Sequence, residues 1–226
     1  MNINSSKFNL SFQKKLMAKA NVIKNNEPCP VSIYKLDRKQ DKDYIKNLRE
    51  NDSDWSYAYY LTDMEEQFEQ AKYARLINGE NLKFYTLEDE NQKCLGLVEV
   101  DNGGIGKQNI VYFERFPADY QKHRYKYIGE TLLSFLAKQQ KAAKAPRKIV
   151  VDNAMIEAQE FYLKSHFKYM YDGCTYNQMY LPTVDCDESA GYNGSSADKM
   201  FLPKYNDDLL LESNKYHTKS EIELVG

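Results

Sequence analysis

The segment from Lys122 to Leu133 carries residue types that bind phosphate. It reads Lys-His-Arg-Tyr-Lys-Tyr-Ile-Gly-Glu-Thr-Leu-Leu and places Lys122, Arg124 and Lys126 in a loop before an apolar helical pattern. Where a loop turns into a helix, backbone N–H groups point outward and the positive end of the helix dipole lies behind them. The sequence therefore predicts a site for a phosphorylated ligand at this turn.

Patterns on either side of the loop predict the elements that position it. Residues 109–116 alternate and favour a strand, with one face formed by Ile110, Tyr112 and Glu114 and the other by Val111, Phe113 and Arg115. After the loop, apolar residues recur at helical spacing at Ile128, Leu132, Phe135 and Leu136. We therefore expect a strand, a cationic loop and a helix in succession.

The loop resembles the central motif of the GNAT superfamily, the acyl-CoA-dependent N-acyltransferases. That motif reads Arg/Gln-x-x-Gly-x-Gly/Ala before the third helix, and the matching positions here are Arg124, Tyr127 and Gly129. Tyr127 stands where the family usually has glycine. A Cβ at this point narrows the approach of a pyrophosphate, and only a requirement for positive φ would exclude a side chain there.

A second match follows the strand predicted at residues 148–151. The family's Asn-x-x-Ala-x-x-x-Tyr-x-x-x-Gly-Phe segment is similar to the stretch that contains Asn153, Ala158, Tyr162 and Phe167, in which His166 replaces the glycine. The two motifs occur in the order strand, loop, helix, strand, helix, strand, which the fold requires. The resemblance covers roughly residues 30–182.

The resemblance implies an α/β (α+β) fold with a GNAT-like mixed, mostly antiparallel central sheet of about six to seven strands flanked by helices. It also implies an enzyme, an N-acetyltransferase that moves an acetyl group from acetyl-CoA to a primary amine by direct attack. No cysteine stands in the loop to favour a covalent intermediate. The acceptor stays open among a small molecule, a polyamine and a protein lysine.

The resemblance also assigns roles to single residues. Acyl transfer needs a proton for the departing thiolate and a base for the ammonium form of the acceptor. Tyr162 is the expected acid, because the pKa of a phenol is about 10, not far above that of a thiol; the alternative is that it only packs over the pantetheine arm. Glu114 is the first candidate base and Glu99 the second, and either could instead be a solvated strand residue. The expected cofactor contacts are Arg124, Tyr125, Lys126, Tyr127, Ile128 and Gly129, with Asn153 on the pantetheine arm.

Composition limits the remaining classes of function. A chain of 226 residues with 42% hydrophobic content suits one core, and the formal charge of −2 lacks the excess that nucleic-acid or membrane partners favour. The four cysteines form no Cys-x-x-Cys pair and the three histidines no cluster, so no metal site is expected. No signal peptide or run of 18 apolar residues is present, so we expect a cytoplasmic protein.

The chain is expected to divide into three parts. Residues 1–29 form an N-terminal extension, in which Phe12, Leu16, Ala20 and Ile23 predict a short amphipathic helix over residues 11–24 before Pro28 and Pro30 break the chain. Residues 30–182 form the acetyltransferase domain. Residues 183–226 form an acidic, irregular tail, apart from Leu209, Leu210 and Leu211, which are expected to dock on the body or on a second subunit, as in a homodimer.

Within residues 30–182, local patterns predict the remaining elements. Strands are expected at residues 31–36, 82–87, 94–100, 148–151, 167–171 and 176–181, and helices at residues 41–49, 63–77 and 157–164. The aromatic cluster at residues 55–60 either fills the seam between two helices or shapes the acceptor pocket.

Two alternatives from other classes stay open. A catalytically weak or inactive GNAT-fold protein that still binds CoA would act as an interaction or regulatory protein, and the substitutions at Tyr127 and His166 favour it. Nucleic-acid binding would use the eight Lys and Arg residues from Lys122 to Lys148, a segment that contains only one acidic residue. We regard it as the weaker alternative, because no basic stripe with interleaved aromatics extends beyond the loop.

Overall fold

The computed structural model describes residues 14–37, 41, 43–51, 81–115, 124–169, 197–203 and 206–225. In this part of the chain the strands are β1 (Lys15–Lys24), β2 (Glu27–Lys35), β3 (Leu82–Asp89), β4 (Cys94–Asp101), β5 (Lys107–Arg115), β6 (Tyr125–Lys126), β7 (Lys148–Met155), β8 (Lys168–Tyr169), β9 (Ala197–Phe201) and β10 (Glu223–Leu224). The helices are α1 (Tyr44–Asn51), α3 (Ile128–Ala142), α4 (Ile156–Lys164) and α5 (Asp207–Thr218). The predicted helix at residues 63–77, the aromatic cluster at residues 55–60 and the strand at residues 176–181 lie outside the described residues.

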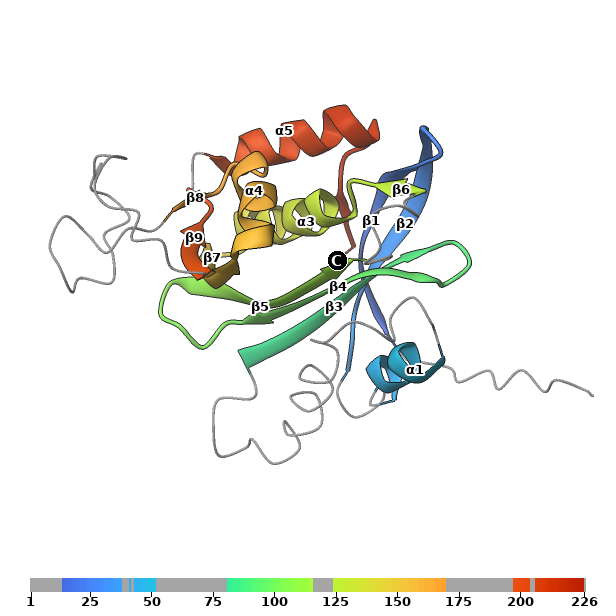
Figure 1. The fold of residues 1–226 in the computed structure, drawn as a ribbon, viewed down its shortest axis with the longest axis horizontal. Coiled ribbons are helices and arrows are strands. Elements are labelled where there is room, and N and C mark those ends of the chain that lie inside the picture. Colours follow the sequence, from blue (N-terminus) through green and yellow to red (C-terminus); the bar gives the residue numbers. More distant parts are fainter. Residues whose placement is uncertain are drawn as a thin grey trace, which may run out of the picture.

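All ten described strands belong to one sheet, in the order β10-β1-β2-β3-β4-β5-β7-β9-β8, with β6 paired to β1 (Figure 1). Each described pair is antiparallel except β5 and β7, which are parallel. This confirms the predicted mixed, mostly antiparallel sheet. The strand count exceeds the expected six to seven because segments near both ends of the chain join the sheet.

The two faces of the sheet carry different helices (Figure 1). On one face the ring of Tyr85 packs edge-on against Phe135 of α3, with 5.1 Å between ring centroids. The neighbouring Thr86 points to the other face, where its hydroxyl and that of Tyr44 in α1 both donate to Glu88 Oε1. Successive strand residues alternate between faces, so α3, α4 and α5 cover one side and α1 lies on the other.

The prediction of an amphipathic helix at residues 11–24 is wrong, because residues 15–24 form β1. Its buried residues follow a period of two, with Ala18, Ala20 and Val22 inside. The helical stripe omitted Ala18 and Val22, both fully buried. Asn25 and Asn26, both at positive φ, then form the two-residue turn of a β-hairpin.

Pro28 and Pro30 do not break the chain, as was expected, but lie inside β2. They pair with Ile23 and Asn21 of β1. Pairing of β2 with β3 begins only at Val31. Among the described residues, the prolines therefore occupy the part of β2 that has one unpaired edge, where a missing N–H is tolerated.

The prediction of an irregular tail at residues 183–226 is also wrong for residues 197–201, 207–218 and 223–224, which form β9, α5 and β10. Leu210, Asn214 and Thr218 are buried at a spacing of four and form the inner stripe of α5. Two of the three are polar, which weakens the hydrophobic pattern. Leu210 is buried against the body of the fold, which was one of the two positions expected for this leucine cluster. Leu209, in contrast, is 47% exposed.

The other described elements match the predictions made for them, which are strands at β2, β3, β4, β5, β7 and β8 and helices at α1, α3 and α4. Among the helices in the described ranges, none combines the length and the apolar character that crossing a bilayer requires.

Candidate functional site

The parallel strands β5 and β7 pair over only three residues and then diverge. Lys107, Gln108 and Asn109 face Lys148, Ile149 and Val150. Both strands continue, β5 to Arg115 and β7 to Met155, and over this part β7 pairs along its other edge, with β9. At the point of divergence the amide of Asp152 donates to the side chain of Asn109 at 3.2 Å. Within the described residues, the backbone of β5 beyond Asn109 therefore has no strand partner on this side.

A bulge in β5 lies directly beyond this point. Glu99 of β4 faces Tyr112, and the next residue, Val100, faces Ile110, which leaves Val111 as an extra residue. A bulge reverses the alternation of the strand and leaves backbone groups outside the ladder. Ile110 therefore does not share a face with Tyr112 and Glu114, and the prediction that the three lie together is wrong.

The cationic loop is held at one side by the β1–β2 hairpin. Ile23 and Lys24 pair with Lys126 and Tyr125, and the amide of Asn25 donates to the carbonyl of Arg124 at 3.0 Å. These contacts fix the direction in which the chain enters α3.

The first turn of α3 leaves its amides available to a ligand. The first backbone bond of the helix runs from Thr131 N–H to the Tyr127 carbonyl at 2.9 Å. Among the residues that the structure describes, no group accepts from the N–H of Ile128, Gly129 or Glu130, and no side chain caps the helix. Three amides at the positive end of a helix dipole form an anion-binding site.

Four of the six residues in the predicted loop contact set divide into two kinds. The side chains of Arg124 and Lys126 are exposed beside the helix start. Those of Tyr125 and Ile128 are buried, and the Tyr125 hydroxyl donates to Asp89 Oδ2 at 3.0 Å. Only backbone groups of these two residues can therefore meet a ligand.

Tyr127 adopts the left-handed conformation, with φ 66° and ψ 17°. Glycine adopts this conformation most easily, which accounts for the glycine that the resembled motif usually has at this position. This conformation costs a residue with a Cβ about 1 kcal/mol. The Tyr127 ring stacks on His217 of α5, with centroids 4.5 Å apart and planes at 13°. The stack offsets part of that cost and fixes the ring beside the loop.

Helix α5 also binds the first turn of α3 through Glu130. His217 Nδ1 lies 3.2 Å from both carboxylate oxygens of Glu130, and Ser213 Oγ donates to Glu130 Oε1 at 3.0 Å. The sequence predicts no role for these three residues, because their contacts join segments more than 80 positions apart. No local pattern could have identified them.

Gly129 allows α3 to approach α4 and β5 closely. A Cβ on this residue would lie 2.8 and 2.9 Å from ring atoms of Phe161 and 3.3 Å from Phe113. Ring atoms inside a packed cluster cannot retreat without moving α4. The glycine therefore sets the distance between the loop and the neighbouring helix.

We expect Gly129→Ala to lower the free energy of unfolding by roughly 1–2 kcal/mol, because overpacking outweighs the better helix propensity of alanine. Urea denaturation measures the change. Gly104→Ala is the control, since its Cβ would make only an ordinary contact of 3.4 Å, and it should change stability by less than about 0.5 kcal/mol. Equal stability of both variants would show that α3 and α4 separate without cost.

Tyr162 lies in an aromatic cluster beside the divergence of β5 and β7. It is 4% exposed, and its ring packs against Phe161 and Phe167 at 5.2 Å and Phe113 at 6.4 Å. Burial raises the pKa of Tyr162 above its ordinary value. Within the described part of the chain its hydroxyl has no hydrogen-bond partner. A neutral, protonated phenol is thus held next to β5.

The two predicted carboxylates lie on the opposite face of the sheet. Glu99 is fully buried and pairs with Tyr112, whereas Val98 pairs with Phe113, whose ring meets α4. Glu114 is half-buried, and burial raises the pKa of its carboxyl, partly countered by the Arg115 N–H and charge. The structure therefore brings Tyr162 and Glu114 to opposite sides of the same strand end, where β5 has no β7 partner.

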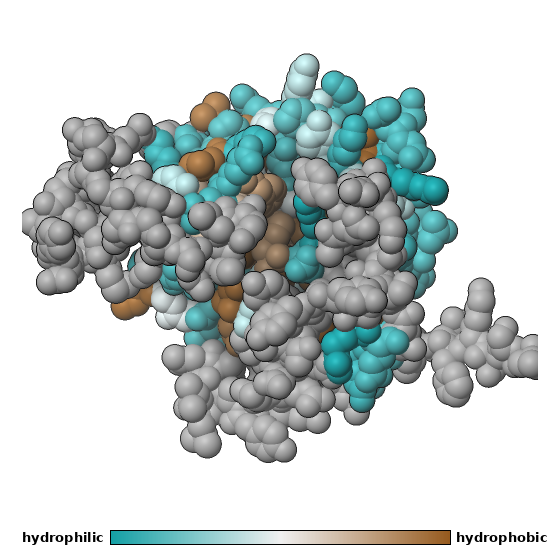
Figure 2. Space-filling view, in the orientation of Figure 1, coloured by the Kyte–Doolittle hydropathy of each residue, from teal (hydrophilic) through white to brown (hydrophobic). Residues whose placement is uncertain are grey.

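Asn153 lies in β7 beyond the point where this strand leaves β5. Its side chain is outside the described part of the structure. Figure 2 shows apolar side chains gathered at the centre of this face, in the region of α3, α4 and β5, and mainly hydrophilic ones over α5.

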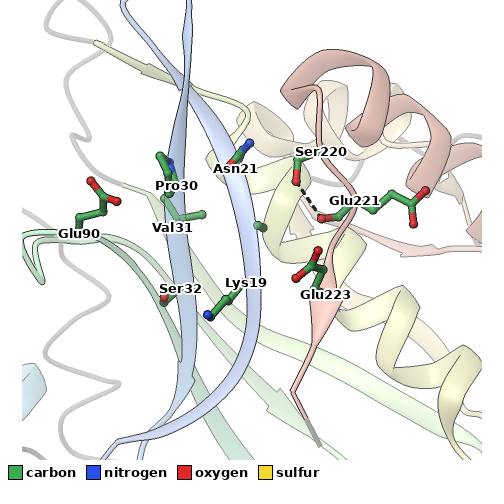
Figure 3. A pocket seen from close by; sticks show the side chains of 10 residues that line it. Lys19, Asn21, Pro30, Val31, Ser32, Glu90, Ser220, Glu221 and Glu223 are labelled. Atoms are coloured by element: carbon green, nitrogen blue, oxygen red, sulfur yellow. Dashed lines mark hydrogen bonds between the residues drawn. The ribbon is translucent and has the colours of Figure 1, made fainter.

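A separate pocket of about 380 Å³ lies between the β1–β2 hairpin and the segment after α5 (Figure 3). Glu90, Glu221 and Glu223 line it with Lys19. The three carboxylates are exposed, and Glu221 already pairs with Lys215 at 2.5 Å. The pocket shares no residue with the loop or with the strand divergence.

No family model matches the chain, and neither does any curated protein. Among solved structures it is similar to spermidine N-acetyltransferase from Vibrio cholerae in complex with CoA and spermine, at 18% identity and a TM-score of 0.45 over 78% of this chain and 97% of that chain. A dodecameric form of the same enzyme shows 19% identity and a TM-score of 0.46 over 84% and 98%. A GNAT-family acetyltransferase from Staphylococcus aureus shows 15% identity and a TM-score of 0.42 over 77% and 99%.

Proposed function

We propose that this protein is a GNAT-type N-acetyltransferase that uses acetyl-CoA to acetylate a primary amine. The observation that carries the proposal is a juxtaposition. Two parallel strands diverge after Asn109, and three amides at the start of α3 have no acceptor among the described residues. The diverging strands supply a strand edge for an extended ligand, and the three amides supply a site for its phosphates.

The residues present fit the cofactor. The amides of Ile128, Gly129 and Glu130 would hold the pyrophosphate, with the exposed cations of Arg124 and Lys126 beside them. The unpaired backbone of β5 would hydrogen-bond the pantetheine arm, and Asn153 would contact it from β7. When bound, acetyl-CoA supplies an activated acyl group as a thioester.

Tyr162 and Glu114 would handle the protons of the reaction. Burial raises the pKa of Tyr162, which keeps the phenol protonated although it weakens it as an acid, and this hydroxyl would give its proton to the thiolate as the leaving group develops its charge. Glu114 would take a proton from the ammonium form of the acceptor, directly or through water. Its raised pKa makes it a better base once ionised. Glu99 is the rival base, at the neighbouring position on the same face of the sheet.

Two measurements test the proposal. Calorimetry with acetyl-CoA should show saturable binding that Arg124→Gln and Lys126→Gln weaken. Thiol release should then depend on an added amine, with a panel of small amines, polyamines and lysine peptides as acceptors. Binding without thiol release for any amine would favour the alternative of a CoA-binding protein without catalysis. Absence of binding would overturn both.

A further inference from the structure

A pocket of about 580 Å³ lies at the C-terminal end of α3, where the helix no longer covers the sheet. It is formed by the ends of β1, β2 and β3, by the segment after α3 and by β10. Its volume is within the range of small-molecule sites. The 15 residues of α3, at 1.5 Å each, place it about 22 Å from the cofactor loop.

Among the described residues, four cations from four segments line this pocket, which we call the cationic pocket: Lys15, Lys35, Lys83 and Arg147. Lys15 and Lys35 face each other directly across β1 and β2. Lys35 in turn faces Tyr85, two residues from Lys83 on the same face of β3. Like charges directly opposite each other on paired strands lower stability, so this arrangement destabilises the folded state.

No carboxylate offsets these charges within the described residues. The described lining contains no Asp or Glu, and none pairs with Lys15, Lys35 or Lys83. Lysines elsewhere do have such partners, as Lys138 and Lys215 do with Glu221. Burial lowers the pKa of Lys83, and the positive charges of Lys35 and Arg147 lower it further. Among the residues that the structure describes, the positive charge of the pocket is therefore uncompensated.

Polar groups hold Arg147 in place and complete the wall. The Arg147 guanidinium donates to the carbonyl of Asn102, and its backbone N–H donates to Gln140 Oε1 at 2.8 Å. The Gln108 side chain is buried and donates to Asn102 Oδ1 at 3.1 Å. The wall thus presents hydrogen-bonding amides as well as charge.

Stabilisation of the end of α3 does not explain the cluster. Cations near a helix C-terminus interact favourably with its dipole, but α3 carries its own Lys141 in the last turn, and its Gln140 carbonyl accepts from Ala143 N–H. In the described structure, none of the three pocket lysines donates to a helix carbonyl.

We propose that the cationic pocket binds a small polyanion with two or more phosphate or carboxylate groups, held by Lys35, Lys83 and Arg147, with Lys15 at the rim. Such a ligand relieves the repulsion among the cations, so its binding stabilises the fold. The site is separate from the cofactor loop and does not depend on acetyl transfer.

The test is an NMR titration of the full chain with pyrophosphate and, separately, with citrate. Saturable shifts of the Ala143 and Ala145 amides are expected, and Lys83→Gln should weaken this binding at least tenfold. Without ligand, Lys83→Gln should unfold at the same or a higher temperature, because it removes repulsion. Lys35→Gln serves as a second variant with the same expected pattern.

Lys126→Gln, in the cofactor loop, is the control and should leave the shifts of Ala143 and Ala145 unchanged. Binding of both anions supports recognition of charge, and binding of one alone assigns the site to phosphates or to carboxylates. Shifts confined to Ile128 and Gly129, the absence of saturable binding, or equal affinity of wild type and Lys83→Gln would overturn the proposal.

Discussion

Tyr162→Phe is expected to lower kcat at least 100-fold and to leave the affinity for acetyl-CoA unchanged. General acids contribute about 10²–10⁴ in rate, and the variant loses only the phenol proton. The ring that packs against Phe113, Phe161 and Phe167 is kept. Because the hydroxyl has no partner among the described residues, its removal leaves no buried group unsatisfied, and stability should stay within about 0.5 kcal/mol of wild type.

The matched control is Tyr85→Phe. Tyr85 is also a buried phenol that packs on an aromatic ring, in this case Phe135, but it lies near the far end of α3. Loss of the Tyr85 hydroxyl should leave kcat within twofold of the wild-type value. Steady-state kinetics with acetyl-CoA and an amine measures both variants, and calorimetry measures their affinity. An unchanged kcat for Tyr162→Phe would remove its role as acid and leave only its packing role.

The sequence predicted the central part of the fold because local patterns there agree with the final packing. Strands β3, β4 and β5 and helix α3 each occur where they were expected, although a bulge interrupts the alternation of β5. Strand β1 was read as a helix because Leu16, Ala20 and Ile23 also fit a helical stripe. The choice between the two periods depends on pairing with β2, a contact that the sequence alone does not display.

The C-terminal segment shows a different limit of sequence reasoning. The inner stripe of α5 contains Asn214 and Thr218, which are buried because the Thr131 hydroxyl donates to Asn214 and the Thr218 hydroxyl to the Asn214 carbonyl. A polar residue buried by specific hydrogen bonds gives no hydrophobic signal. The same applies to Glu130 and His217, whose pairing depends on how α5 docks.

The two substituted glycines show what the motifs could and could not say. Both Tyr127 and His166 have φ of 66°, so each keeps the left-handed turn that glycine usually supplies. The motif therefore marked a backbone conformation correctly, although the side chain differs. What it could not reveal is that the extra ring of Tyr127 would find a stacking partner on α5.

Glu114→Gln is expected to lower kcat about 100-fold and to raise stability at neutral pH. The activity falls because the amide cannot accept the proton of the acceptor ammonium, and general bases contribute at least this factor. The rate of the wild type should rise with pH as Glu114 ionises, above the ordinary pKa of a glutamate, since burial raises the pKa of this carboxyl. The variant should lack that limb of the pH–rate profile.

Glu114→Gln should raise stability while it lowers activity, and the raised pKa of Glu114 is the reason for the gain in stability. A carboxyl whose pKa is higher in the folded state favours folding when protonated, and this contribution is lost as the pH rises from the unfolded pKa, about 4.3, through the raised folded value. Urea denaturation should therefore find Glu114→Gln more stable than wild type at pH 7 and equal to it near pH 4. Glu99→Gln is the comparison. A loss of activity in Glu99→Gln together with full activity in Glu114→Gln would move the base to β4, because only one of the two carboxylates can then face the acceptor.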